Sequence, residues 1–167
     1  MRLSLIALAI LLSVAPSSGA AQSDSTAVVA TLDRFLRALY ARDTAAMKAE
    51  FETDARMTLL RPDPAGGMRV VALNADGFVK AATNPNGPAL DEPLRNLVVL
   101  IDGDLASVWG EYQVRVQGRV SHCGYDAFHL VRRGGVWRIL NVSDTFRREG
   151  CGAPWTTSAI DPSRTPR

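Results

Sequence analysis

The chain has 167 residues, of which 47% are hydrophobic and 22% are charged, and its formal net charge is +2. These proportions are typical of one globular domain and exclude a disordered, collagen-like or membrane-embedded chain. Nineteen basic residues balance 17 acidic residues, so the chain lacks the basic excess that nucleic-acid-binding domains carry. We therefore expect no nucleic-acid partner.

The first residues have the three parts of a secretory signal peptide. Arg2 supplies a positive charge, residues 3–14 are nearly all apolar, and residues 16–21 supply the small side chains that a signal peptidase accepts. The apolar run is too short to span a bilayer comfortably, which argues against the alternative of an uncleaved anchor. We predict a cleaved signal peptide over residues 1–21 and a periplasmic or secreted mature protein with no membrane contact.

The two cysteines, Cys123 and Cys151, are an even pair in a protein that is expected to enter an oxidising compartment. Exposed thiols tend to be oxidised there, so one disulfide is expected, and two buried free thiols are the alternative. No histidine pattern at metal-ligand spacing accompanies the cysteines. We predict neither a metal site nor a cofactor.

The first half of the mature chain predicts helices and short strands. Apolar side chains recur at three- and four-residue steps over residues 25–40, which indicates an amphipathic helix with the inner residues Val28, Leu32, Phe35, Leu36 and Leu39. Asp43 or Thr44 begins a second, short helix that ends near Phe51. The elements expected next are a strand at 57–60, a loop at 61–67, a strand at 70–73 and a helix at 76–82.

The second half predicts four long strands, at residues 94–101, 105–117, 120–133 and 136–146. Glycine-containing tight turns separate them, and such turns between alternating runs are a strong hairpin signal. We expect an antiparallel meander in an α+β domain whose helices cover one face of the sheet. The domain is predicted to span residues 22–146, and residues 147–167 are predicted to form a C-terminal tail.

Three stretches, FLRALYARDTAAMKAEF, VLIDGDLASVWGEY and GYDAFHLVRRGGVWRILNVSDTF, resemble the nuclear transport factor 2-like superfamily. Within it they are most similar to the small bacterial SnoaL-like and lumazine-binding groups, over about residues 26–145. The resemblance implies a cone-shaped fold, in which a strongly bent antiparallel sheet wraps around N-terminal helices and leaves a cavity open at one end. Members include isomerases, dehydratases, cyclases, ligand carriers and oligomerising modules, so the fold does not fix an activity. The chain does not match the complete acid-and-tyrosine set of ketosteroid isomerases.

Hairpin register decides which side chains share one face of the sheet. Two-residue turns at Gly118-Arg119 and Gly134-Gly135 would place Glu111 opposite Asp126. The resulting wall is apolar with a few polar groups, which is the composition of a small-molecule site. Its expected members are Trp109, Phe128, Leu130, Trp137, Ile139, Asn96, Val98, Leu100, Glu111, Asp126, Asn141 and Ser143, together with Tyr40 at the end of the first helix and His122 near the mouth.

Two carboxyls that face each other repel, which would raise the pKa of one of them and suit general acid–base catalysis by Glu111 and Asp126. The alternatives are an ion pair between Glu111 and Arg115 and a purely hydrogen-bonding role for both carboxyls. His122 is a candidate base, with a polar rim residue as the alternative. His129 lies on the opposite face in this register and is expected to be packed or interfacial.

Three classes of function follow from these features. The first is an exported small-molecule-binding protein that holds a partly apolar ligand in the cavity of the cone. The second is an isomerase, dehydratase or cyclase that uses the Glu111/Asp126 pair, and the third is an oligomerisation module. The opposite face of the sheet is also apolar, so we expect either a homodimer through it or cover by the C-terminal tail. The chain has no HExxH, GxxxxGK[ST] or GxSxG motif.

Overall fold

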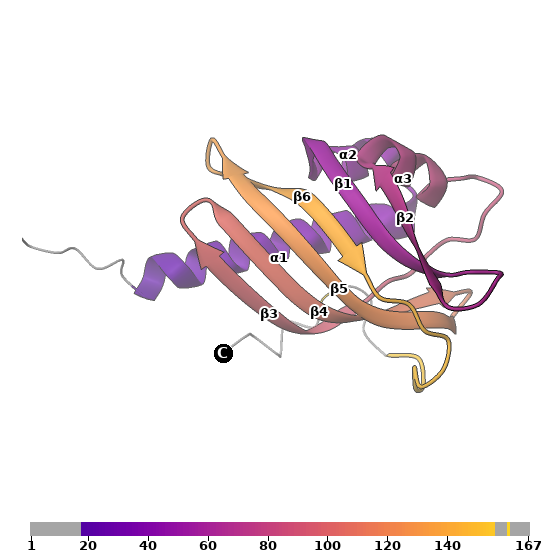
Figure 1. Cartoon of the computed structure of the whole chain (residues 1–167). Helices are drawn as coiled ribbons and strands as arrows, with labels where there is room; N and C mark the ends of the chain where they lie inside the picture. Colours follow the sequence, from indigo (N-terminus) through magenta and orange to yellow (C-terminus); the bar gives the residue numbers. More distant parts are fainter. Residues whose placement is uncertain (1–17, 156–159, 161–167) are drawn as a thin grey trace, which may run out of the picture.

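The computed structural model describes residues 18–155 and residue 160 (Figure 1). Most of the predicted signal peptide, residues 1–17, lies outside the described residues, and so does much of the predicted tail, at 156–159 and 161–167. No helix within the described part of the chain is long and apolar enough to cross a membrane.

The three helices form where the sequence pattern predicts them. Helix α1 (Ser18–Ala41) begins before the predicted residue 25, while α2 (Thr44–Ala49) and α3 (Ala75–Ala82) are short. The side chain of Asp43 accepts a hydrogen bond from the Ala46 amide at 3.0 Å and caps α2, and Asn74 caps α3 through the Gly77 amide at 2.8 Å. The predicted apolar stripe of α1 is buried in the core.

The six strands form one sheet in the order β2-β1-β6-β5-β4-β3. The predicted meander is confirmed: β3 (Leu94–Asp102), β4 (Leu105–Val116), β5 (Arg119–Arg133) and β6 (Val136–Asp144) pair antiparallel in succession. The sheet then continues with β1 (Phe51–Pro62), which is parallel to β6, and β2 (Met68–Asn74), which is antiparallel to β1. The strand predicted at 57–60 is therefore much longer, because it pairs on both of its edges.

The bent sheet and the helices enclose one core. Helix α1 crosses one face of the sheet, and α2 and α3 lie beside the β1 and β2 end (Figure 1). The ring of Phe35 on α1 meets Phe51 edge-on at 5.3 Å between ring centroids and Phe128 on β5 at 6.5 Å. The face that α1 covers is called the inner face below, and the other is called the outer face.

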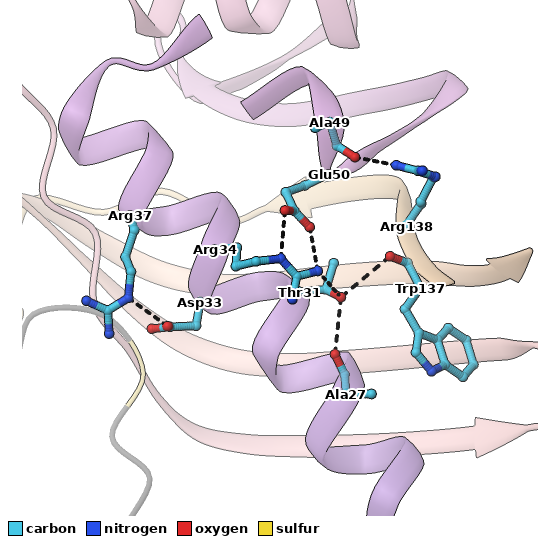
Figure 2. Close-up of polar contacts among 9 residues, drawn as sticks. All are labelled: Ala27, Thr31, Asp33, Arg34, Arg37, Ala49, Glu50, Trp137 and Arg138. Atoms are coloured by element: carbon cyan, nitrogen blue, oxygen red, sulfur yellow. Dashed lines mark hydrogen bonds and ion pairs between the residues drawn. The ribbon is translucent and has the colours of Figure 1, made fainter. Parts of the chain in front are cut away.

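Polar contacts fix α1 against the end of α2 and against β6 (Figure 2). The guanidinium of Arg34 donates from Nε and Nη2 to the two carboxylate oxygens of Glu50, each at 2.8 Å. The Thr31 hydroxyl donates to the Ala27 carbonyl at 3.1 Å and lies 3.5 Å from the carbonyl of Trp137. These contacts fix the position of α1 relative to the sheet. Because α1 contributes side chains to the cavity described below, they also help to fix its shape.

The predicted register between β4 and β5 is wrong. The residues with positive φ at this turn are Gln117 (51°) and Gly118 (74°), so the two-residue turn lies one position earlier than Gly118-Arg119. The extra residue Ser121 then bulges out of β5, and the strands beyond it pair Glu111 with Tyr125 and Asp126 with Gly110. Because side chains alternate along a strand, Glu111 and Asp126 lie on opposite faces of the sheet.

The predicted register between β5 and β6 holds for half of the hairpin. The Gly134-Gly135 turn forms, and Leu130 pairs with Ile139 as expected. An extra residue on β6, Leu140, then bulges out and reverses the alternation. Beyond it Asn141 pairs with His129, so Asn141 and Ser143 leave the inner face, where Val142 and Asp144 take their places.

The predicted disulfide between Cys123 and Cys151 is present, and it returns the chain to the outer face of the sheet. The Gln113 amide nitrogen donates to the carbonyls of Cys151 (3.0 Å) and Ala153 (3.1 Å), and the Trp155 amide donates back to Gln113 Oε1 at 2.9 Å. The side chain of Gln113 is fully buried as a result. Residues 147–155, called the strap below, cover this part of the outer face.

Candidate functional site

A cavity of about 250 Å³ lies between the helices and the inner face of the sheet. Helices α1 and α3 supply apolar side chains, while β1, β4, β5, β6 and the segment before β3 supply both apolar and polar ones. The apolar wall consists of Phe35, Leu39, Leu59, Phe78, Leu90, Val114, Phe128 and Val142. The polar end consists of Arg61, Glu92, Tyr112, His122, Asp126 and Asp144, and is called the carboxyl end below.

Asp126 is the most deeply buried acid of the cavity. Its register on β5 turns it to the inner face, where the side chain is 2% exposed. The Oδ2 atom accepts no hydrogen bond from an N–H or O–H donor of the described residues, and the interaction of this carboxyl is with the neighbouring Glu92 carboxyl, through a shared proton. Burial, followed by the negative charges of Glu92 and Asp144, raises the pKa of Asp126 well above its usual value.

Glu92 lies just before β3 and faces the same cavity. Burial, followed by the charge of Asp144, raises the pKa of Glu92 to about 7. Glu92 and Asp126 interact strongly and titrate as a pair, so near neutral pH the pair retains a proton that two isolated carboxyls would have released.

Asp144 and Arg61 close the carboxyl end. Arg61 Nη1 donates to Asp144 Oδ1 at 2.8 Å and to Oδ2 at 2.6 Å, and the Leu60 amide donates to Oδ1 at 2.9 Å. Burial nevertheless raises the pKa of Asp144, although the bonds from Arg61 oppose the rise. Arg61 thus bonds to Asp144, while its charge also opposes the rise that burial causes in the pKa values of Glu92 and Asp126.

Tyr112 and His122 are neutral members of the site. The Tyr112 hydroxyl donates to the Thr145 carbonyl at 2.6 Å, and burial with the nearby carboxylates raises the pKa of the phenol. Burial, followed by the charges of Arg61 and Arg148, lowers the pKa of His122 to about 4. The imidazole therefore offers a hydrogen bond at neutral pH but no positive charge.

Three of the residues expected in the cavity line it, namely His122, Asp126 and Phe128. Trp137 is buried on the inner face but does not line the cavity. Tyr40 is 60% exposed and lies instead at a second hollow of about 540 Å³, beside Arg42.

Leu130 and Ile139 are buried on the inner face, like Trp137, and do not line the cavity. The remaining expected members lie on the outer face: Asn96, Val98, Leu100, Trp109, Glu111, Asn141 and Ser143. Trp109 is 48% exposed and stacks on Tyr125 at 5.2 Å between ring centroids. Glu111 accepts hydrogen bonds from Arg95 Nε at 2.8 Å and Asn96 Nδ2 at 3.0 Å. Partial burial acts to raise the pKa of Glu111, but these bonds outweigh it and lower the pKa.

An ion pair at Glu111 does form, but Arg95 and not Arg115 is its partner. Arg115 pairs with Asp91 instead. Arg95 on β3 lies directly opposite Glu111 on β4, whereas Arg115 forms a bridge with Asp91.

Sequence reasoning missed four residues of the carboxyl end: Arg61, Glu92, Tyr112 and Asp144. Arg61 and Glu92 adjoin prolines, in segments that resemble loops, and no periodicity assigns such residues to a face. Asp144 reaches the inner face only because of the bulge at Leu140. The sequence held one chemical signal for Asp144. An acid near the end of a largely apolar strand needs a hydrogen-bond or ionic partner if it is buried, and this need points to a polar cluster.

A family model described as "Putative lumazine-binding" matches residues 23–145, and the chain belongs to that family. The membership of the nuclear transport factor 2-like superfamily and the α+β cone fold are thereby confirmed. No curated protein matches the chain.

Solved structures share the fold at low sequence identity. A Mycobacterium tuberculosis protein of unknown function is 14% identical with a TM-score of 0.66, over 79% of this chain and 76% of that chain. A Shewanella baltica NTF2-like protein of unknown function is 15% identical, with a TM-score of 0.58 over 77% and 97%. A Streptomyces avermitilis protein described as a "putative dehydratase" is 15% identical, with a TM-score of 0.60 over 74% and 96%.

Proposed function

We propose that this domain binds a compact, partly apolar small molecule in the inner cavity, with a polar group of the ligand at the carboxyl end. The unpartnered, buried Oδ2 of Asp126 carries this proposal, because a buried polar atom without a partner is unfavourable unless a ligand or water supplies one. The apolar wall around Phe128 would hold the rest of the molecule.

The volume of the cavity limits the size of the ligand. At about 250 Å³ it falls just below the usual range of drug-sized pockets, about 300–1,000 Å³. The description of the family, lumazine binding, also supports a compact ligand.

Proton transfer is the second candidate function. Asp126 and Glu92 are two adjacent carboxyls with raised pKa values in a cavity, the arrangement that suits a general acid and base near neutral pH. An isomerase, dehydratase or cyclase would use this pair in place of the Glu111/Asp126 pair, whose members lie on opposite faces. The solved structure described as a "putative dehydratase" supports this class by analogy of fold alone.

We also propose that the mature protein is exported and forms a homodimer through the outer face. The sequence features of residues 1–21 support export. Exposed apolar side chains on two neighbouring strands, Val98 and Leu100 on β3 and Trp109 on β4, support the dimer. An oligomerisation module with an unused cavity is the alternative that binding experiments address.

Native mass spectrometry of the protein from the extracytoplasmic fraction of its own host tests these proposals in one spectrum. The expected species is a dimer of chains that begin at Ala21 or Gln22, with an additional small-molecule mass. Monomers alone would contradict the dimer, and a retained Met1 would contradict cleavage.

A matched pair of variants locates the small molecule. Val142→Phe adds a ring inside the cavity, whereas Val70→Phe makes the same change at an exposed position on β2. The bound mass should be lost from Val142→Phe and kept by Val70→Phe. A bound mass that survives in Val142→Phe, or no bound mass in the wild-type protein, would contradict binding in the cavity.

A further inference from the structure

We propose that the inner cavity selects ligands that carry a positive charge, such as a protonated amine on a small apolar or aromatic body. This inference rests on the proposed function, because it assumes that the cavity binds a small molecule. It adds the charge of the ligand and the atoms that recognise it.

The charges that face the cavity do not balance. Three acids, Glu92, Asp126 and Asp144, come from three segments of the chain. Arg61 is the one cationic side chain among the described lining residues, and its Nη1 donates to both oxygens of Asp144. Burial and the neighbouring acids raise the pKa values of Glu92 and Asp126, although the charge of Arg61 also reaches both carboxyls and opposes the rise. One cation therefore faces three acids in the described part of the cavity lining.

The other titratable groups around the pair do not supply the missing charge. His122 on β5 is neutral near pH 7, and the hydroxyl of Tyr112 on β4 donates a hydrogen bond to a backbone carbonyl. Asp91, next to Glu92, is negative and already paired with Arg115. The residues of α1 and α3 that line the cavity are all apolar.

The geometry offers an acceptor for the ligand. An ammonium group at the carboxyl end would donate to the unpartnered Oδ2 of Asp126, and charge-assisted hydrogen bonds of this kind are stronger than neutral ones. The same group would relieve the repulsion between the carboxyls of Glu92 and Asp126. A ring attached to it would pack against Phe128 and Phe78 on the apolar wall.

The same arrangement disfavours anions and is coupled to protons. A carboxylate ligand would add a negative charge beside three acids that share one guanidinium among the described lining residues, and Nη1 of that guanidinium already donates to Asp144. A cation that binds near neutral pH would displace the proton held by the Glu92/Asp126 pair, and this proton passes to the buffer.

Calorimetric titration of the mature protein near pH 7 tests the inference with three probes of similar shape: benzylamine, benzyl alcohol and benzoate. Benzylamine is expected to bind at least about tenfold more tightly than benzyl alcohol, with benzoate weakest. Its binding enthalpy should also change with the ionisation enthalpy of the buffer, because a proton is released.

Variants assign the effect to named carboxyls. Asp126→Asn and Glu92→Gln each remove one carboxyl of the pair and should weaken benzylamine binding by about tenfold or more. Glu149→Gln makes the same chemical change at an exposed position of the strap and should bind benzylamine like the wild-type protein. Two independent cavity variants keep the test valid if circular dichroism shows that one of them does not fold.

The outcomes separate this inference from the proposed function. Tighter or equal binding of benzyl alcohol or benzoate would overturn the charge selectivity and leave a binding cavity. Benzylamine binding that neither cavity variant weakens would also overturn it, because the amine would then lie elsewhere. Failure of all three probes to bind would contradict both the charge selectivity and the proposed binding of compact ligands.

Discussion

Two carboxyls of neighbouring strands, Glu111 and Asp126, have opposite shifts of pKa because they lie on opposite faces of the sheet. Arg95 and Asn96 donate to Glu111 on the outer face and lower its pKa. Asp126 on the inner face is buried beside two other acids, and its pKa rises. The neighbours, rather than the residue type, decide which carboxyl can hold a proton near neutral pH.

The raised pKa of Glu92 predicts how the stability of the protein changes with pH. A carboxyl whose pKa is higher in the folded state binds more protons when folded, so the free energy of unfolding falls as pH rises through the interval between the two values. For Glu92 this interval runs from 4.5 to about 7. We expect the free energy of unfolding, measured by urea titration, to fall across it.

Glu92→Gln should flatten this dependence. The variant removes the carboxyl itself and also the charge that helps to raise the pKa of Asp126. The difference between the two proteins should amount to about 1.4 kcal/mol for each unit of pKa shift that is lost. Glu149→Gln serves as the control, and an equal slope in wild type and Glu92→Gln would show that Glu92 titrates normally.

At the scale of elements, local signals were sufficient to predict most of the fold. The apolar period of α1 and the glycines at positions 103, 118 and 134 identify the long helix and the meander without tertiary information. The pairing of β1 with β6 was not predicted, because parallel neighbours far apart in sequence leave no turn signal between them.

The side chains that face the cavity were harder to predict than the helices and strands that carry them. The turn at Gln117-Gly118 instead of Gly118-Arg119 shifts the pairing by two residues, and the extra residue Ser121 on β5 shifts it back by one, so that Glu111 and Trp109 lie on the outer face. A second bulge at Leu140 exchanged Asn141 for Asp144. Shifts of one residue leave the strands intact but reverse which side chains face the ligand, and alternation alone cannot reveal them.

The disulfide that joins the strap to β5 is expected to stabilise the fold. The disulfide closes a loop with a sequence separation of 28, which in the chain-entropy model stabilises the fold by about 3 kcal/mol. Replacing both Cys123 and Cys151 with Ser should therefore lower the free energy of unfolding by about that amount in urea titration. A reducing agent should destabilise the wild-type protein and leave the double variant unchanged. Equal stability of the two proteins without reductant would show that the bridge contributes nothing.

At the scale of the whole molecule, the inner face of the sheet forms the cavity, and the outer face carries the strap and an exposed apolar patch. The inner face and the helices enclose a largely apolar cavity that ends in four ionisable side chains: Arg61, Glu92, Asp126 and Asp144. The outer face carries the strap over Gln113 and an exposed apolar patch at Trp109. A dimer through the outer face would therefore leave the cavity free to bind.

The most direct test of a ligand site on the inner face is a crystal structure of the mature protein soaked with benzylamine. We predict density for the ring against Phe128 and for the nitrogen within hydrogen-bond distance of Asp126. The ring would then lie on the apolar wall, and the nitrogen at the carboxyl end. Density beside Trp109 and Glu111 on the outer face, with none in the cavity, would contradict the account.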